Sequence, residues 1–135
     1  MAYETPITIA EVMKNISADR YVLPSIQREY VWDTDQIENL FDSLMRNYPI
    51  GTFLFWEINK EHVNDYDFYG FIRNYHEKKF EHNKKINLKG SDGVTAVLDG
   101  QQRLTSIYLG LKGTYAYKLK YLARNNENAY PVRKL

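Results

Sequence analysis

Five residues whose types could serve binding or catalysis follow directly after an apolar run. They are residues 99–103, with the sequence Asp-Gly-Gln-Gln-Arg. The run before them, residues 94–98, predicts a β-strand. The residues after them predict a helix, because apolar side chains recur at helical spacing, namely Leu104, Ile107, Tyr108 and Leu111. The first N–H groups of a helix lack partners within it and favour an anion, commonly phosphate. This spacing alone indicates either a phosphate site or a plain strand-to-helix turn, and it matches neither a P-loop nor a dinucleotide fingerprint.

Three residues of this segment, Gly100, Arg103 and Asp99, suit a phosphate site. Gly100 has no Cβ, so a ligand can approach its backbone closely. Arg103 carries a planar fork of donors that fits two phosphate oxygens at once. Asp99 has two readings, since it can hold a metal ion or orient a water, or it can cap the helix through its side chain.

A second cluster of chemically useful side chains stands ahead of another expected helix: Gln27, Arg28, Tyr30 and Trp32. Such a run can stack on a base and contact phosphate, or it can pin the helix to the core. The helix after it is predicted over 34–47, because Asp33 and Gln36 form a capping signal and apolar residues follow at helical spacing.

The remaining elements complete an expected α+β domain. Thr8 and Glu11 fit a capping box for a short helix over 9–17, and residues 21–24 read as a brief extended segment ended by proline. Residues 52–58 predict a strand buried on both faces. A helix over 69–80 and a strand over 115–122 are also predicted from the pattern.

The composition fits one ordinary globular domain of 135 residues, with 44% hydrophobic and 26% charged residues. The net charge of +1 argues against a protein that coats nucleic acid through overall charge, so any anion site is local. There is no cysteine, which excludes disulfides and thiolate metal sites. The most apolar stretch, residues 50–58, is far shorter than the roughly 20 residues that span a bilayer. We therefore expect a soluble cytoplasmic protein that does not contact membranes.

The middle of the chain, residues 59–93, is polar and charged and reads as an insertion between core elements. Four of its basic residues are candidates for weak DNA binding: Lys78, Lys79, Lys84 and Lys85. The alternative is that these charges simply face water. The three histidines, His62, His76 and His82, do not have the spacing of metal ligands on one helix face.

Two motifs together resemble a known family. The first is Gln27-Arg28-x-Tyr30-x-Trp32, and the second is the Asp-Gly-Gln-Gln-Arg segment at 99–103, followed by Leu104 and Thr105. In this order they resemble the N-terminal domain of GmrSD-type modification-dependent restriction enzymes, over residues ~5–112. That domain is similar to the ParB/sulfiredoxin-like fold, a small α+β domain in which a strand, a turn and a helix carry nucleotide phosphates.

The resemblance implies a domain that binds and hydrolyses an NTP, senses modified or foreign DNA and controls a nuclease. The implied catalytic residues are Asp99, Gln101, Gln102 and Arg103, and the implied nucleotide-binding residues are Gly100, Gln27, Arg28, Tyr30 and Trp32. In such a domain we expect Arg28 and Arg103 to clamp phosphate oxygens. Either Gln101 or Gln102 would orient the attacking water. Asp99 is the expected ligand of Mg²⁺.

The chain also departs from this family. The HNH-type nuclease that the resemblance implies as a partner has no counterpart motif here, and family N-terminal domains usually run longer. We therefore expect a fragment of a larger protein, with a small stand-alone subunit as the alternative and a homo-oligomer left open. Two other functions stay open at this point, a DNA-binding or protein-interaction module without hydrolysis and a ParB-like domain that nicks DNA.

Overall fold

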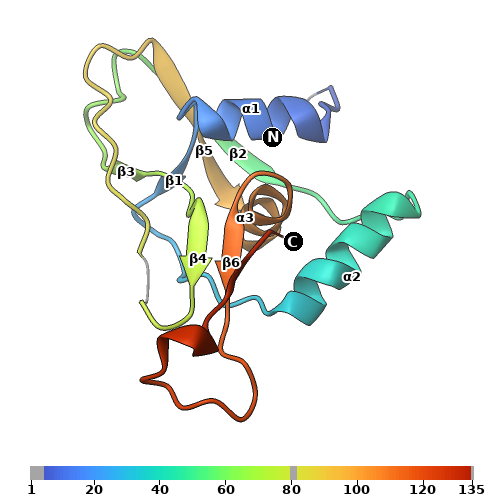
Figure 1. Cartoon of the computed structure of the whole chain (residues 1–135). Coiled ribbons are helices and arrows are strands. Elements are labelled where there is room, and N and C mark those ends of the chain that lie inside the picture. The colour runs from blue at the N-terminus through green and yellow to red at the C-terminus, as the bar shows by residue number, and fades with distance from the viewer. Residues whose placement is uncertain (1–4, 80–81, 135) are drawn as a thin grey trace.

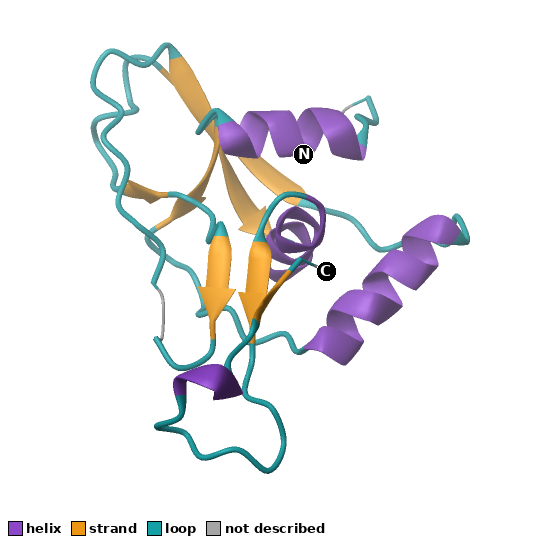
Figure 2. Ribbon diagram, viewed as in Figure 1, coloured by secondary structure: helices purple, strands orange, loops and turns teal. Residues whose placement is uncertain are grey.

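The computed structural model describes residues 5–79 and 82–134, and Figures 1 and 2 show how its helices and strands are arranged. In chain order the elements are α1 (Ile9–Ser17), β1 (Tyr21–Pro24), α2 (Thr34–Met45), β2 (Leu54–Asn59), β3 (Phe68–Tyr69), β4 (Asn74–His76), β5 (Gly93–Asp99), α3 (Gln101–Leu111), β6 (Thr114–Ala116), a 3-10 turn (Glu127–Ala129) and β7 (Val132–Arg133). This mixture confirms the predicted α+β class. The finer likeness to the ParB/sulfiredoxin-like fold stays a prediction.

The main sheet has the strand order β2-β5-β1-β3. Its two central strands, β1 and β5, are parallel, with Tyr21 opposite Thr95 and Val22 opposite Ala96. The outer strands are antiparallel to their neighbours. Because β1 and β5 are parallel, their carboxyl ends lie at the same edge of the sheet, and both predicted motifs begin there.

Helices α1 and α3 cover one face of this sheet. Apolar side chains of both helices pack with β1 and β5, among them Met13, Ile16, Leu23, Val97 and Ile107. Helix α2 lies against α3 rather than against the sheet, as Figure 1 shows, and Ile37 packs there with Leu109. The core side chains of the opposite face are Val22, Ile58, Val63, Phe68, Val94 and Ala96.

The two predicted helix starts are confirmed by their capping bonds. The Thr8 hydroxyl accepts from the Glu11 amide at 3.2 Å. At α2 the capping is reciprocal: the Asp33 carboxylate accepts from the Gln36 amide, and the Gln36 side chain accepts from the Asp33 amide. Helix α2 ends at Met45, two residues before the predicted end.

Segment 59–93, expected as a polar insertion, contributes to the core and to both sheets. It supplies β3 and β4, and four of its apolar side chains are buried, namely Val63, Phe68, Phe71 and Ile72. Strand β4 begins the second sheet, whose order is β4-β6-β7. The segment is therefore polar in composition, but its few apolar side chains are part of the core.

Three sequence predictions of secondary structure are wrong in part. The predicted helix over 69–80 is replaced, within the described residues, by β3 and β4, because Phe68 and Tyr69 pair with β1 and Asn74–His76 pair with β6. The strand over 115–122 is limited to β6. Strand β2, predicted to be buried on both faces, lies at an edge of the main sheet, and of its six residues only Ile58 is buried.

Within residues 5–79 and 82–134, none of the helices combines the length and the apolar character that crossing a membrane requires.

Candidate functional site

The parallel pairing of β1 and β5 brings the two motifs together. After β1 the chain continues into Gln27 and Arg28, and after β5 it turns at Gly100 into α3. Ligands of open sheets commonly bind outside the carboxyl ends of parallel strands. One side chain joins the two strand ends directly, since Gln101 Nε2 donates to the Val97 carbonyl at 2.9 Å and lies 3.5 Å from the Ile26 carbonyl.

The turn between β5 and α3 depends on glycine. Gly100 is the N-cap of α3 and has φ of +90°, a left-handed conformation that side chains disfavour. The Asp99 carboxylate accepts from the Gly100 amide at 2.9 Å, and no side chain caps the helix. Of the two readings of Asp99, the structure thus does not support the one in which its side chain caps α3. The amides of the first turn, residues 101–103, point out of the helix end without intrahelical partners.

Gln102 holds the second motif in place through its backbone. Its Nε2 donates to the Glu29 carbonyl at 3.0 Å, and its Oε1 accepts from the Val31 amide at 3.1 Å. The side chain therefore satisfies one donor and one acceptor of a segment that forms no strand or helix of its own. Gln102 positions the loop that carries Arg28 and Tyr30.

Arg103 holds a third segment, the loop that leads into β2. Its two terminal nitrogens donate to the Ile50 carbonyl at 2.7 Å and to the Thr52 carbonyl at 2.8 Å. Its guanidinium also lies over the ring of Phe53, 4.4 Å from the centroid. Two of its five N–H donors are engaged in these bonds, and the other three form no hydrogen bond within the described residues.

The aromatic residues of the second motif are anchors of that loop. Tyr30 is 6% exposed, and its hydroxyl lies 2.9 Å from Ser106 Oγ. Since Ser106 Oγ donates to the Gln102 carbonyl, the Tyr30 hydroxyl is the donor to Ser106. Burial raises the pKa of Tyr30 to about 12. Trp32 is half-buried, and its carbonyl accepts from the Tyr115 hydroxyl at 3.0 Å. Of the two readings of this cluster, the structure supports pinning to the core for Tyr30.

Gln27 and Arg28 differ from these anchors. The Oε1 atom of Gln27 is fully buried and has no hydrogen-bond partner among the described residues. Arg28 is exposed, and within the described parts of the chain its guanidinium makes no hydrogen bond or ion pair. Arg28 therefore keeps its guanidinium accessible to a ligand, whereas the unpartnered Gln27 oxygen lies beneath the surface.

The four candidate DNA-binding lysines lie in two places. Lys78 and Lys79 follow β4, where the Lys78 ammonium lies 5.8 Å from the Tyr130 ring centroid. Lys84 and Lys85 lie beside β3, and Lys85 forms an ion pair with Asp67 at 2.8 Å, which raises its pKa. All four side chains are exposed.

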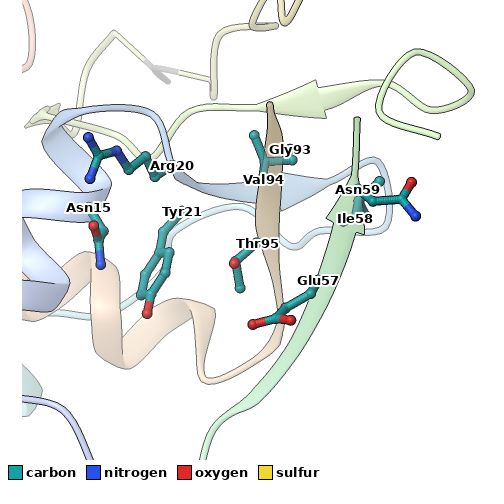
Figure 3. A pocket seen from close by; sticks show the side chains of 9 residues that line it. All are labelled: Asn15, Arg20, Tyr21, Glu57, Ile58, Asn59, Gly93, Val94 and Thr95. Atoms are coloured by element: carbon teal, nitrogen blue, oxygen red, sulfur yellow. The ribbon is translucent and has the colours of Figure 1, made fainter. Parts of the chain in front are cut away.

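A broad hollow of the surface lies at the other end of the main sheet (Figure 3). It measures about 610 Å³ and is open to solvent, and Asn15, Arg20, Tyr21, Glu57 and Thr95 are among its lining residues. No residue of either motif lines it. Within the described residues, no three or more His, Asp or Glu side chains gather where they could hold a metal ion.

Sequence reasoning missed the partners of Arg103. The Ile50 and Thr52 carbonyls and the Phe53 ring are separated from Arg103 by about fifty residues, and no local pattern links them. One signal was present, since Gly51 stands between the two carbonyls. A Cβ at Gly51 would lie 2.6 Å from an Arg103 terminal nitrogen.

Comparison with known proteins decides the family. The GmrSD restriction endonuclease N-terminal domain matches residues 9–134, nearly the whole chain. The chain belongs to this family. A GmrSD N-terminal domain is a domain of a restriction system, which confirms the resemblance seen in the two motifs. The chain is also similar to an uncharacterized protein of Methanocaldococcus jannaschii, MJ0686, with 38% identity over 103 residues. That match covers 76% of the present chain and 16% of the relative, so this GmrSD N-terminal domain spans a small part of that protein's length.

Proposed function

We propose that this GmrSD N-terminal domain binds a nucleoside triphosphate, hydrolyses it and thereby regulates DNA cleavage by a nuclease domain or subunit elsewhere in the system. One observation carries the proposal. The two motifs converge at the carboxyl edge of the parallel strands β1 and β5, next to the first turn of α3. Within the part of the chain that the structure describes, this edge combines the first amides of α3, which lack intrahelical partners, the Arg28 guanidinium, which has no partner, and the Asp99 carboxylate.

We place the phosphate chain of the nucleotide at the N-terminus of α3. The amides of residues 101–103 and the positive end of the helix dipole favour its negative charge. Arg28 belongs to the loop after β1 and has no partner among the described residues, so its exposed guanidinium is available for a charge-assisted contact with a phosphate. Arg103 has three N–H donors that bond to none of the described residues and would add to this contact, while its other two hold the loop before β2.

The residues fit a phosphate-bound Mg²⁺. Mg²⁺ is commonly held by one or two carboxylates together with substrate phosphates. The Asp99 side chain is exposed at the turn. Its Oδ1 atom accepts from the Gly100 amide, so its Oδ2 atom is available for the ion. Asp99 would hold the ion, which supplies positive charge to the phosphates when it is bound.

Hydrolysis needs a water aligned with the terminal phosphorus, so that a new P–O bond forms as the bond to the leaving diphosphate breaks. Gln101 is better suited to orient this water than Gln102. The Oε1 atom of Gln102 already accepts from Val31, whereas that of Gln101 accepts no hydrogen bond from the described residues. Gln102 then acts as a positioning residue.

The test is calorimetric titration of the protein with ATP and GTP in the presence of Mg²⁺. We expect Arg28→Ala to weaken binding by about 10- to 100-fold, the value of one charge-assisted contact. Arg124→Ala, which removes an exposed arginine from the loop after β6, is the matched control and binds as the wild type does. Absence of nucleotide binding in all three proteins would overturn the proposal.

Arg103→Ala is the poorer test, because it also removes two bonds that hold the loop before β2. For hydrolysis, Gln101→Ala is compared with the wild type by release of inorganic phosphate. We expect slower release of phosphate in Gln101→Ala, and its nucleotide affinity, measured in parallel, reports what the loss of the bond to the Val97 carbonyl does to binding.

DNA binding is the second candidate function, and the exposure of Lys78, Lys79 and Lys84 favours it. Replacing exposed phosphate-binding lysines lowers the salt dependence of binding by about one unit of slope for each lysine replaced. Binding of duplex DNA without nucleotide, with a slope that falls in the Lys78, Lys79 and Lys84 variants, would support this function.

A further inference from the structure

Two loops at one end of the second sheet concentrate positive charge. Residues 117–126, which follow β6, include three basic residues and no acidic one, namely Lys118, Lys120 and Arg124. Lys78 and Lys79 follow β4. Because the whole chain has a net charge of only +1, this charge is local. We call residues 77–79 and 117–126 together the basic end.

The parallel pairing of β4 and β6 brings the two loops together. His76 lies opposite Ala116, so both strands end side by side, and Figure 1 shows both loops beyond these strand ends, on the side of the molecule away from α1. The Lys118 amide donates to the Glu77 carboxylate at 2.6 Å, and the Glu77 amide donates to the Ala116 carbonyl at 2.9 Å. The one acidic residue of the basic end is Glu77, and its carboxylate already accepts a hydrogen bond.

Tyrosine rings lie among these charges. The Lys78 ammonium lies 5.8 Å from the centroid of the Tyr130 ring, which is buried. Tyr121 differs, because it is 100% exposed and its φ of +69° lies in the left-handed region that bulky side chains disfavour. Neither burial nor backbone preference accounts for a tyrosine at this position, whereas a ligand that covers the ring would.

An exposed aromatic ring among cations suits an unpaired strand of nucleic acid. Proteins that bind single strands combine positive charge, which attracts the phosphate backbone, with rings on which bases stack. In a duplex the faces of the bases are covered by their neighbours in the stack. A duplex can therefore use the charges of the basic end but not the Tyr121 ring.

We propose that the basic end binds single-stranded DNA, with one base stacked on Tyr121 and phosphates of the same strand held by the exposed side chains of Lys120 and Arg124. The strand is DNA because the chain belongs to a family of restriction endonuclease domains. Binding at the basic end needs no nucleotide, so it is separate from the proposed phosphate site at α3. It also differs from the second candidate function, because Lys84 and Lys85 lie beside β3, outside the basic end.

The experiment measures the fluorescence anisotropy of labelled oligothymidylate, a strand that does not pair with itself, and of a duplex of equal length, both without nucleotide. Stacking of one base contributes about 1–3 kcal/mol. We therefore expect Tyr121→Ala to bind oligothymidylate about 5- to 150-fold more weakly than the wild type and the duplex equally well. Tyr121→Trp, which keeps a ring, should bind oligothymidylate at least as tightly as the wild type. Tyr48→Ala, which removes an exposed tyrosine after α2, is the matched control and should bind as the wild type does.

The cations are tested through the salt dependence of binding. For single strands the logarithm of the affinity falls with the logarithm of the salt concentration by about 0.7 for each phosphate neutralised. The double variant Lys120→Gln, Arg124→Gln should therefore reduce this slope by about 1.4. The double variant Lys14→Gln, Lys89→Gln, with two exposed lysines outside the basic end replaced, should leave the slope unchanged.

The outcomes separate this site from the other two functions. A loss of affinity in Tyr121→Ala that is confined to oligothymidylate supports it. Equal affinity of Tyr121→Ala and the wild type, or an equal loss for the duplex, overturns stacking of an unpaired base and with it the proposal. Absence of oligothymidylate binding by the wild type also overturns it, while the nucleotide site is decided independently by the titrations of Arg28→Ala.

Discussion

At the scale of single residues, Gly100 is fixed by two separate constraints. Its φ of +90° is a conformation that L side chains rarely adopt. A Cβ at this position would also lie 2.2 Å from Cδ1 of Phe53, whose ring is held under the Arg103 guanidinium. Backbone strain and a steric clash therefore act together at the turn that begins α3.

Gly100→Ala should lower the free energy of unfolding by about 2–4 kcal/mol, since the clash adds to the strain of a left-handed residue. Gly90→Ala is a matched control, because Gly90 has φ of +80° but a Cβ there would meet no heavy atom within 4 Å. Gly90→Ala should lower the free energy of unfolding only by the backbone strain, about 1–2 kcal/mol. Urea unfolding of both variants measures the difference. Equal decreases would show that the Phe53 ring moves aside without cost.

At the scale of elements, the first turn of α3 organises the loops around it. Three consecutive side chains each hold a different segment: Gln101 holds the ends of β1 and β5, Gln102 holds residues 29–31, and Arg103 holds the loop before β2. Residues 25–32 form no helix or strand, so their placement depends on these side-chain bonds. Loosening the turn therefore disturbs both motifs at once.

Gln102→Ala should release residues 29–31 while the core stays folded. The loss of two hydrogen bonds predicts a decrease of about 1–3 kcal/mol in the free energy of unfolding. Hydrogen exchange of the Val31 amide, which donates to Gln102, should become markedly faster. Gln36→Ala, which opens the capping box of α2 only, should leave the exchange of Val31 unchanged. Unchanged exchange in Gln102→Ala would contradict this role.

At the scale of the whole molecule, tyrosines join the second motif to the second sheet. Tyr30 packs against Tyr75 of β4, which packs against Tyr115 of β6, with ring centroids 5.3 and 4.7 Å apart. Burial is the main cause that raises the pKa of each of these three hydroxyls. The folded protein therefore keeps protons that the unfolded chain releases above pH 10.

Stability should accordingly be lost in alkali. The contribution of these tyrosines is fully present below pH 10 and is lost as pH rises through the folded-state pKa values, that of Tyr30 being about 12. Urea unfolding between pH 9 and 12 should show a shallower decline in Tyr30→Phe than in the wild type. Tyr121→Phe, at a fully exposed position, should decline as steeply as the wild type. A decline in Tyr30→Phe as steep as in the wild type would refute the role of Tyr30.

Elements that depend on neighbouring residues can be predicted from this sequence, whereas contacts between distant residues cannot. The caps at Thr8 and Asp33 are readable because a capping box is a pattern of four residues. The segment after Phe68 reads as a helix by its local pattern, since its pairing with β1 is invisible there. The chemistry of 99–103 follows from residue types, but the loop residues that Gln102 and Arg103 hold are 51 to 73 residues away. Spacing cannot specify such partners.

The parallel pairing of β1 with β5 also sets the order in which the site can arise during synthesis. Residues of β1 leave the ribosome early, yet their neighbour in the sheet is translated some seventy residues later. Contacts this distant in sequence form slowly, because a long loop must close first. The loop that carries Arg28 is therefore held by Gln102 only after α3 has been made. A nascent chain that ends before Gly100 lacks α3 and with it the three side chains, Gln101, Gln102 and Arg103, that hold the loops around the turn.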